Sequence, residues 1–233
     1  MITIRQAISQ IDSRMKSTMD TRIAPKAIWN QYVFNLASIL KQSNEVKRIY
    51  KSSDIWQKIN CLAMTKVPAV DCLELAPLVN EYLAKSIEKL PHTYTSAAGD
   101  MIRDLNSTYP YGKQYRIVTP KEYKAIRKRK FVDPTFGYAF IIQDYLYIPD
   151  SEIEKVTITA AFINPKEVDI LNGGDPCKPF LNYPFYAPEY LVKAVRDLVV
   201  ADLVPREQIK KDEETDMNES NARGADQGNA NSK

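Results

Sequence analysis

The sequence predicts an α+β fold, in which two N-terminal helices and one C-terminal helix pack with an antiparallel β meander. Apolar residues recur at helical spacing near both ends of residues 1–205, which predicts the helices. Residues 137–165 instead alternate apolar and polar side chains with a period of two, which predicts strands. After residue 205 the composition becomes polar. We therefore expect a single α+β body over residues 1–205 and a polar, flexible C-terminal arm over residues 206–233.

The two N-terminal helices have recognisable starting signals. Thr3 is a suitable N-cap for a helix whose apolar positions run from Ile4 to Met15. Pro25 suits the first turn of a second helix, whose apolar stripe runs from Ile28 to Leu40. Both patterns predict amphipathic helices.

Shorter elements are expected in the middle of the chain, where prolines and turn sequences interrupt the apolar pattern. They are an extended segment over residues 55–67, a helix over 77–90, short strands over 101–105 and 115–118, and a helix over 119–130. The last of these begins with Thr119-Pro-Lys-Glu, which is a favourable helix start.

The predicted meander has three strands. They are Tyr138 to Ile142, Tyr145 to Ile148 and Val156 to Phe162. Gln143-Asp144 supplies a tight reversal between the first two strands, although this pair is not a favoured hairpin turn. A connector rich in proline and glycine is expected over residues 166–188, and Pro188 then opens the final helix, which stops at Pro205.

Composition and charge exclude several classes of protein. The net charge is +3, which is too small to dictate an anionic partner, and no apolar run is long enough to span a bilayer. Three widely spaced cysteines make a disulfide framework improbable, which indicates that the protein is made in a reducing interior.

Catalytic and metal-binding arrangements are poorly supported by the sequence. The single histidine, His92, could pair with Cys72, but a structural thiol is the commoner reading. Four carboxylates cluster at the turns of the meander: Asp144, Asp150, Glu152 and Glu154. They leave open an enzyme with a carboxylate site, although such turn residues are usually solvated. No catalytic residue, cofactor or metal is expected.

A basic run supports a second alternative. Its members are Lys121, Lys124, Arg127, Lys128, Arg129 and Lys130. This charge density would attract a phosphate backbone, and Tyr123 and Phe131 could stack on bases. The two aromatic side chains also fit an inward-facing stripe, and no known nucleic-acid-binding module frames the run. A nucleic-acid-binding protein that uses residues 121–130 therefore remains the alternative.

The order of elements resembles one family of virion proteins. Two helices, short strands, a helix starting at Thr119, the strands Tyr-Leu-Tyr-Ile-Pro-Asp and Val-Thr-Ile-Thr-Ala-Ala-Phe-Ile-Asn-Pro, a helix after Pro188 and a polar arm follow one another. This layout is similar to the ring, or head–tail connector (adaptor), proteins of short-tailed bacteriophages, particularly those of crAss-like phages. The resemblance covers residues 1–205 and rests on layout alone, without a short diagnostic motif.

The resemblance implies a structural protein of the virion, at the head–tail junction or in the tail. Copies would form a ring, commonly a dodecamer, that docks to the portal protein or to neighbouring tail rings around a channel for DNA. No membrane partner is implied. The basic helix and the aromatic segments are the expected interfaces between subunits. The candidate interface residues are Arg127, Lys128, Arg129, Tyr145, Tyr147, Tyr183, Phe185 and Tyr186.

Overall fold

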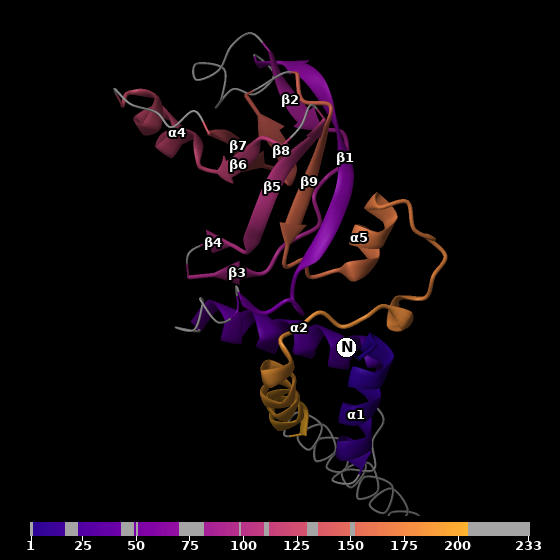
Figure 1. Ribbon diagram of the computed structural model, residues 1–233. Coiled ribbons are helices and arrows are strands. Elements are labelled where there is room, and N and C mark those ends of the chain that lie inside the picture. Colours follow the sequence, from indigo (N-terminus) through magenta and orange to yellow (C-terminus); the bar gives the residue numbers. More distant parts are fainter. Residues whose placement is uncertain are drawn as a thin grey trace, which may run out of the picture.

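The computed structural model combines a layer of helices with a β-barrel (Figure 1). It describes residues 2–16, 23–42, 49, 51–69, 82–97, 99–109, 112–129, 135–149 and 152–204. The barrel and the helical layer lie end to end, and each has its own cluster of buried apolar side chains. The predicted α+β class is therefore confirmed. The C-terminal arm, residues 206–233, lies outside the described residues.

The helical layer contains α1 (Ile4–Lys16), α2 (Pro25–Gln42) and a C-terminal helix described over residues 189–204. The Thr3 hydroxyl accepts a hydrogen bond from the Gln6 N–H, and the Gln6 side chain accepts one from the Thr3 N–H. This reciprocal pair is a capping box, which fixes the start of α1 where the sequence predicts it.

Side-chain hydrogen bonds join α2 to the C-terminal helix. The Tyr32 hydroxyl donates to the Val192 carbonyl over 3.0 Å, and the Gln31 and Asn35 amides both donate to the Asp202 carboxylate over 2.8 Å. Because Asn35 is buried, these bonds satisfy a polar group that would otherwise destabilise the core.

Seven strands form the closed barrel in the order β1-β2-β8-β7-β6-β5-β9. Their bounds are β1 (Gln57–Pro68), β2 (Tyr82–Ser86), β5 (Ile102–Tyr109), β6 (Gln114–Ile117), β7 (Phe136–Ile142), β8 (Tyr145–Ile148) and β9 (Lys155–Ala160). All neighbours are antiparallel except β6 and β7, which pair in parallel. A small hairpin of β3 (Thr95–Ser96) and β4 (Gly99–Asp100) lies at the end of the barrel near the helical layer (Figure 1).

A bend in β1 closes the barrel. One half of β1 pairs with β2 and the other half with β9, and the register shifts between Ile59 and Leu62. Cys61 has a φ of 55° at this bulge. Asn172 follows α5 (Pro165–Leu171); its side chain accepts a hydrogen bond from the Asn60 N–H and donates one to the Lys58 carbonyl. A bulge increases local twist, so Asn172 stabilises the bend that barrel closure requires.

The predicted meander is only partly correct. All three strands exist, and a tight reversal at Gln143 and Asp144, both with positive φ, joins β7 to β8. However, β9 does not pair with β8; it lies between β1 and β5. Alternation identifies a strand and its buried face, but partners distant in the sequence determine its neighbours.

Two other predictions are corrected. Residues 82–86 form strand β2 rather than the end of a helix over 77–90, because the paired edges of β1 and β8 outweigh the local helical spacing. Pro77 lies outside the described residues. The connector over 166–188 contains α5, and Asn164 caps this helix by accepting a hydrogen bond from the Lys166 N–H. Asn-Pro at this position is a helix-start signal that composition alone obscured.

No helix within the described ranges is long and apolar enough to cross a membrane. Cys61 and Cys177 are both exposed free thiols, whereas Cys72 lies outside the described residues.

Candidate assembly surfaces

The basic helix α4 (Pro120–Arg127) is held firmly at its N-terminus. The Thr119 hydroxyl accepts a hydrogen bond from the Glu122 N–H, and the Glu122 carboxylate accepts bonds from the Thr119 N–H and hydroxyl. The bonds that the Glu122 carboxylate accepts lower its pKa below the ordinary value; the bond from the Thr119 N–H has the larger effect and the bond from the hydroxyl the smaller. The capping box therefore keeps Glu122 ionised beside the helix N-terminus, which favours a negative charge.

The inward side of α4 packs on the barrel through Tyr123. Its ring centroid lies 5.5 Å from that of Tyr138 and 5.2 Å from that of Phe140, the latter in an edge-to-face arrangement. Tyr123 is therefore a docking residue of α4 and is not free to stack on a base. Phe131 lies outside the described residues.

The outward side of α4 is positively charged. Lys121, Lys124 and Lys128 are exposed and follow one another at spacings of three and four residues, which places them on one side of the helix. Arg129 is also exposed. None of these four side chains forms an ion pair with another residue in the described part of the chain. We call these four residues the α4 basic face; the side chain of Arg127 lies outside the described residues.

The tyrosines of β8 have different environments. Tyr147 is buried, 6% exposed, and packs with Leu83 and Phe140 beneath the surface. Tyr145 is half-buried, and the Lys85 ammonium lies 4.2 Å from its ring centroid, within the range of a cation–π contact. Tyr145 and Lys85 thus form an amphipathic surface, while Tyr147 contributes to the core.

The aromatic segment at residues 183–186 is mostly internal. Tyr183 and Phe185 are 2% and 3% exposed, and the Phe185 ring makes edge-to-face contacts with Trp29 and Tyr32. Tyr186 is half-buried. Within one chain, Tyr183 and Phe185 therefore hold the helical layer together, and Tyr186 is the aromatic member of this segment with substantial surface.

Burial and nearby carboxylates alter the acidity of this segment. The Tyr183 hydroxyl donates a hydrogen bond to the Asp169 carboxylate of α5 over 3.1 Å. The pKa of Tyr183 is raised mainly by burial, and further by this hydrogen bond and the charge of Asp169. The pKa of Tyr186 is also raised mainly by burial, and further by the charge of Asp169. Both hydroxyls thus remain neutral hydrogen-bonding groups near neutral pH.

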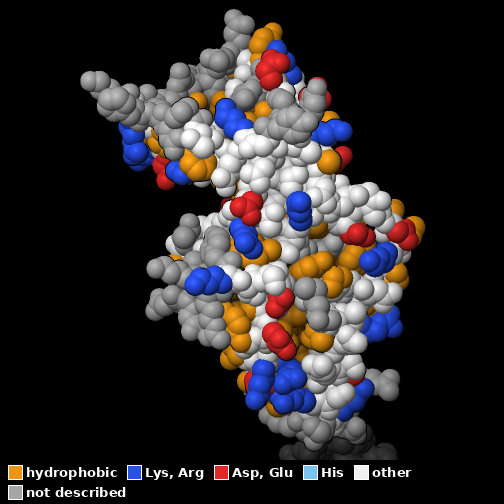
Figure 2. Space-filling model, viewed as in Figure 1, with side chains coloured by type: hydrophobic (Ala, Val, Ile, Leu, Met, Phe, Trp, Pro, Cys, Tyr) orange, Lys and Arg blue, Asp and Glu red, His pale blue; other side chains and the backbone are white. Residues whose placement is uncertain are grey.

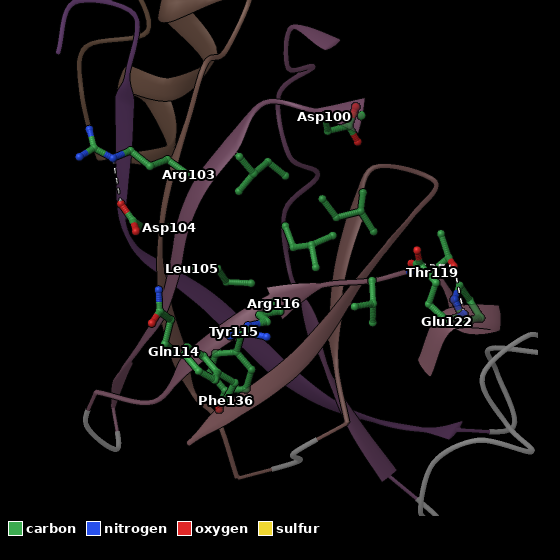
Figure 3. A pocket seen from close by; sticks show the side chains of 16 residues that line it. Asp100, Arg103, Asp104, Leu105, Gln114, Tyr115, Arg116, Thr119, Glu122 and Phe136 are labelled. Atoms are coloured by element: carbon green, nitrogen blue, oxygen red, sulfur yellow. Dashed lines mark hydrogen bonds and ion pairs between the residues drawn. The ribbon is translucent and has the colours of Figure 1, made fainter. Parts of the chain in front are cut away.

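A groove of about 880 Å³ opens between β5 and β6 (Figure 3). The two strands are paired only at Asn106 and Gln114, so they diverge beyond this point. Asp100, Arg103 and Asp104 lie on one side of the groove, and Arg116 lies on the other, with its guanidinium 3.8 Å from the Phe136 ring centroid. The rim of the groove carries both positive and negative side chains. Its charge therefore does not favour one class of small ligand over another.

The carboxylates at the β7–β8 and β8–β9 turns do not form a metal site in the described ranges. No group of three or more metal-binding side chains occurs there. The His92 Nδ1 lies 3.7 Å from the Asp144 carboxylate, and both side chains are largely exposed. Asp150 lies outside the described residues. At 3.7 Å the two groups are too far apart for a hydrogen bond, so Asp144 does not orient the His92 ring as a catalytic carboxylate would.

Exposed apolar side chains were missed by the sequence reasoning. Phe34 is 66% exposed on α2, and Leu198 is 45% exposed on the C-terminal helix. On the face of the molecule drawn in Figure 2, hydrophobic patches lie between charged groups over the helical layer. In the sequence, Phe34 lies outside the apolar stripe of α2, and this position could have identified it as an exposed residue.

Comparison with known families gives one match over almost the whole chain. The model of a family described as phage tail ring protein 2 matches residues 6–227, which include the helical layer, the barrel and α4. No protein among those with curated descriptions matches the chain. The family is one of structural ring proteins, in agreement with the resemblance in the order of elements.

Proposed function

This chain belongs to the phage tail ring protein 2 family of crAss-like phages, and we propose that its copies form a closed ring that joins the portal to the tail components. The family match from residue 6 to 227 is the observation that carries this proposal. It includes both halves of the fold, so the whole described body is the ring subunit. Membership also makes the protein a structural component of the phage tail.

The proposed assembly is a dodecameric ring. In a closed cyclic ring, one face of each subunit contacts a different face of the next. The α4 basic face, the surface of Tyr145 and Lys85, and Tyr186 supply distinct chemistries for such a contact: the first is charged, and the other two each present a half-buried tyrosine. Phe34 adds an exposed aromatic group on the helical layer.

We further propose that the ring surrounds a channel for DNA and acts without catalysis. DNA would pass without sequence-specific contacts, and the neighbours of the ring would be the portal protein and other tail ring proteins. The match to a family of tail ring proteins supports a role in assembly. The protein would be made in the host cytoplasm before it enters the particle.

Nucleic-acid binding by α4 is the second candidate function. The exposed cations of the α4 basic face favour it, because they have no ion-pair partner within the described ranges and each can neutralise a phosphate. The packing of Tyr123 against the barrel removes one of the two aromatic side chains that could stack on bases in this function. Salt-sensitive binding of DNA by the isolated subunit would favour this candidate over the ring.

Imaging of intact virions tests the proposed function. The expected result is a ring of repeated density between portal and tail into which the helical layer and barrel fit in every copy. A matched control is a particle lacking this chain, in which that ring should be missing. A single copy of the chain per particle, or its absence from purified virions, would contradict the proposal.

A further inference from the structure

The α4 basic face lacks the partners that occupy several other cations of the chain. Arg14, Lys16 and Arg196 are engaged in ion pairs. Lys66, Lys85 and Lys178 lie over aromatic rings. Lys121, Lys124 and Lys128 lie on one exposed side of α4 and its C-cap, and the exposed Arg129 follows directly after them. None of these four has an ion-pair partner in the described part of the chain. This concentration of uncompensated charge predicts an acidic partner.

The same chain contains a matching acidic stretch. Residues 212–219 read Asp-Glu-Glu-Thr-Asp-Met-Asn-Glu and include no Lys or Arg. Their five carboxylates are the densest run of negative charge in the sequence, and few of their other side chains could be buried in a core. They follow the C-terminal helix after the short intervening segment 205–211.

The geometry favours a contact between two copies. Figure 1 places α4 beside the half of the barrel that is remote from the helical layer, whereas the C-terminal helix lies on the far side of α2 from the barrel. Within one copy, the barrel and α2 therefore lie between α4 and the C-terminal helix that leads to the acidic stretch. For this reason the contact is placed between copies.

We propose that residues 212–219 of one subunit bind the α4 basic face of another subunit in the ring. The carboxylates lie against Lys121, Lys124, Lys128 and Arg129, and each copy both gives and receives one such contact. This contact rests on the proposed ring and names one pair of its interacting surfaces. Because exposed ion pairs are screened by salt, the contact weakens as the Debye length falls from about 10 Å at 0.1 M to about 3 Å at 1 M.

Charge reversal on both sides tests the contact. One variant carries Lys121→Glu, Lys124→Glu and Lys128→Glu, and the other carries Asp212→Lys, Glu213→Lys and Glu214→Lys. Sedimentation velocity measures the fraction of each full-length chain in rings. Each variant alone should assemble at least about tenfold more weakly than wild type, because like charges then meet at the contact.

Mixing the two defective variants distinguishes contacts between copies from contacts within one copy. In the mixture, the acidic stretch of the first variant meets the basic α4 of the second, and the lysine-substituted stretch of the second meets the glutamate-substituted α4 of the first. Assembly should therefore recover in the mixture and also in the chain that carries all six changes. Recovery only in the six-fold variant would overturn the proposal, since it would place the contact within one copy.

Controls separate this contact from folding, from net charge and from DNA binding. Circular dichroism should show unchanged helix and strand content. A matched triple reversal at the dispersed, exposed residues Lys26, Lys58 and Lys193 should leave assembly within about twofold of wild type.

Normal assembly of the α4 variant together with loss of DNA binding would overturn the proposal in favour of a nucleic-acid partner. If wild type itself forms no ring, the proposed function fails; if only the recovery fails, this contact alone is wrong.

Discussion

Single hydrogen-bonding side chains determine where the elements of this protein begin and bend. Thr3 and Thr119 start α1 and α4 through capping boxes, and Asn172 holds the backbone of β1 at its bulge. The two capping threonines can be recognised in the sequence, because their partners lie three residues away. Asn172 could not be recognised, because Lys58 and Asn60 are distant along the chain.

The capping box of α4 predicts a measurable change in acidity. Thr119→Ala should raise the pKa of Glu122 toward its ordinary value of 4.5, because the hydroxyl bond is lost and the helix start loosens. Since the folded pKa is lowered, the stabilisation is present above the unfolded pKa and is lost as pH falls through the folded pKa. NMR titration of the Glu122 carboxyl measures this. Thr119→Ser is the control, and an unchanged pKa in the alanine variant would contradict the account.

The aromatic residues of the helical layer separate core from surface. Phe185→Ala should lower the free energy of unfolding by about 3–5 kcal/mol, because it removes a buried ring that contacts Trp29 and Tyr32. Phe34→Ala, at an exposed position, should change it by less than about 0.5 kcal/mol. Denaturant-induced unfolding of the two variants, compared with wild type, measures these changes in stability. Equal midpoints for the two variants would show that Phe185 is not a core residue.

The two tyrosines of β8 should differ in the same way. Tyr145→Ala is expected to weaken ring assembly while the thermal unfolding midpoint stays close to that of wild type, since Tyr145 is half-buried beside Lys85. Tyr147→Ala should instead lower the midpoint, because Tyr147 is buried. Light scattering at matched concentrations reports assembly. Full assembly of the Tyr145 variant would remove this residue from the interface.

At the scale of elements, most strands were predictable from the sequence, with β2 as an exception, whereas the order of the strands in the barrel was not. The alternation of Val156, Ile158 and Ala160 correctly predicted β9 and its buried face. Its neighbours β1 and β5 come from segments far away in the sequence, so local periodicity could not reveal the barrel. The same reasoning explains β2, whose helical spacing yields to pairing with β1 and β8.

The candidate surfaces were likewise predictable only in part. The charge of α4 was evident from the sequence, since solvated charges need no distant partner. The burial of Tyr183 and Phe185 was not, because it depends on residues from α2 and α5 that pack around this segment. Tyrosine is common in both cores and interfaces, so its presence alone does not distinguish them.

Docking of α4 through Tyr123 gives a prediction at this scale. Tyr123→Ala should weaken the attachment of α4 to the barrel by about 2 kcal/mol, because two aromatic contacts and buried apolar area are lost. Amide hydrogen exchange should accelerate within α4 and remain slow in β5 and β9. Tyr123→Phe keeps the ring and serves as the control. Uniform acceleration across the barrel would instead mean that α4 and the barrel unfold as one unit.

At the scale of the whole molecule, the helical layer and the barrel share a junction. Trp56, Tyr94 and Met101 belong to the buried cluster of the helical layer, although Trp56 and Met101 directly precede the barrel strands β1 and β5, and Tyr94 precedes β3. The Gln57 side chain also donates a hydrogen bond to the Phe162 carbonyl at this boundary. The helical layer and the barrel are thus joined by packing and by a hydrogen bond, and their different surfaces suit the head-to-tail contacts of the proposed ring.

The mass of the assembled protein tests the ring most directly. Native mass spectrometry of the purified full-length chain, alone and with the other ring proteins of the tail, should show one dominant closed species at an integer multiple of 26.6 kDa. The multiple expected for the proposed dodecamer is twelve, and intermediate sizes should be scarce because ring closure adds a further contact. A chain that remains monomeric at every concentration and beside every tail ring protein would contradict the ring.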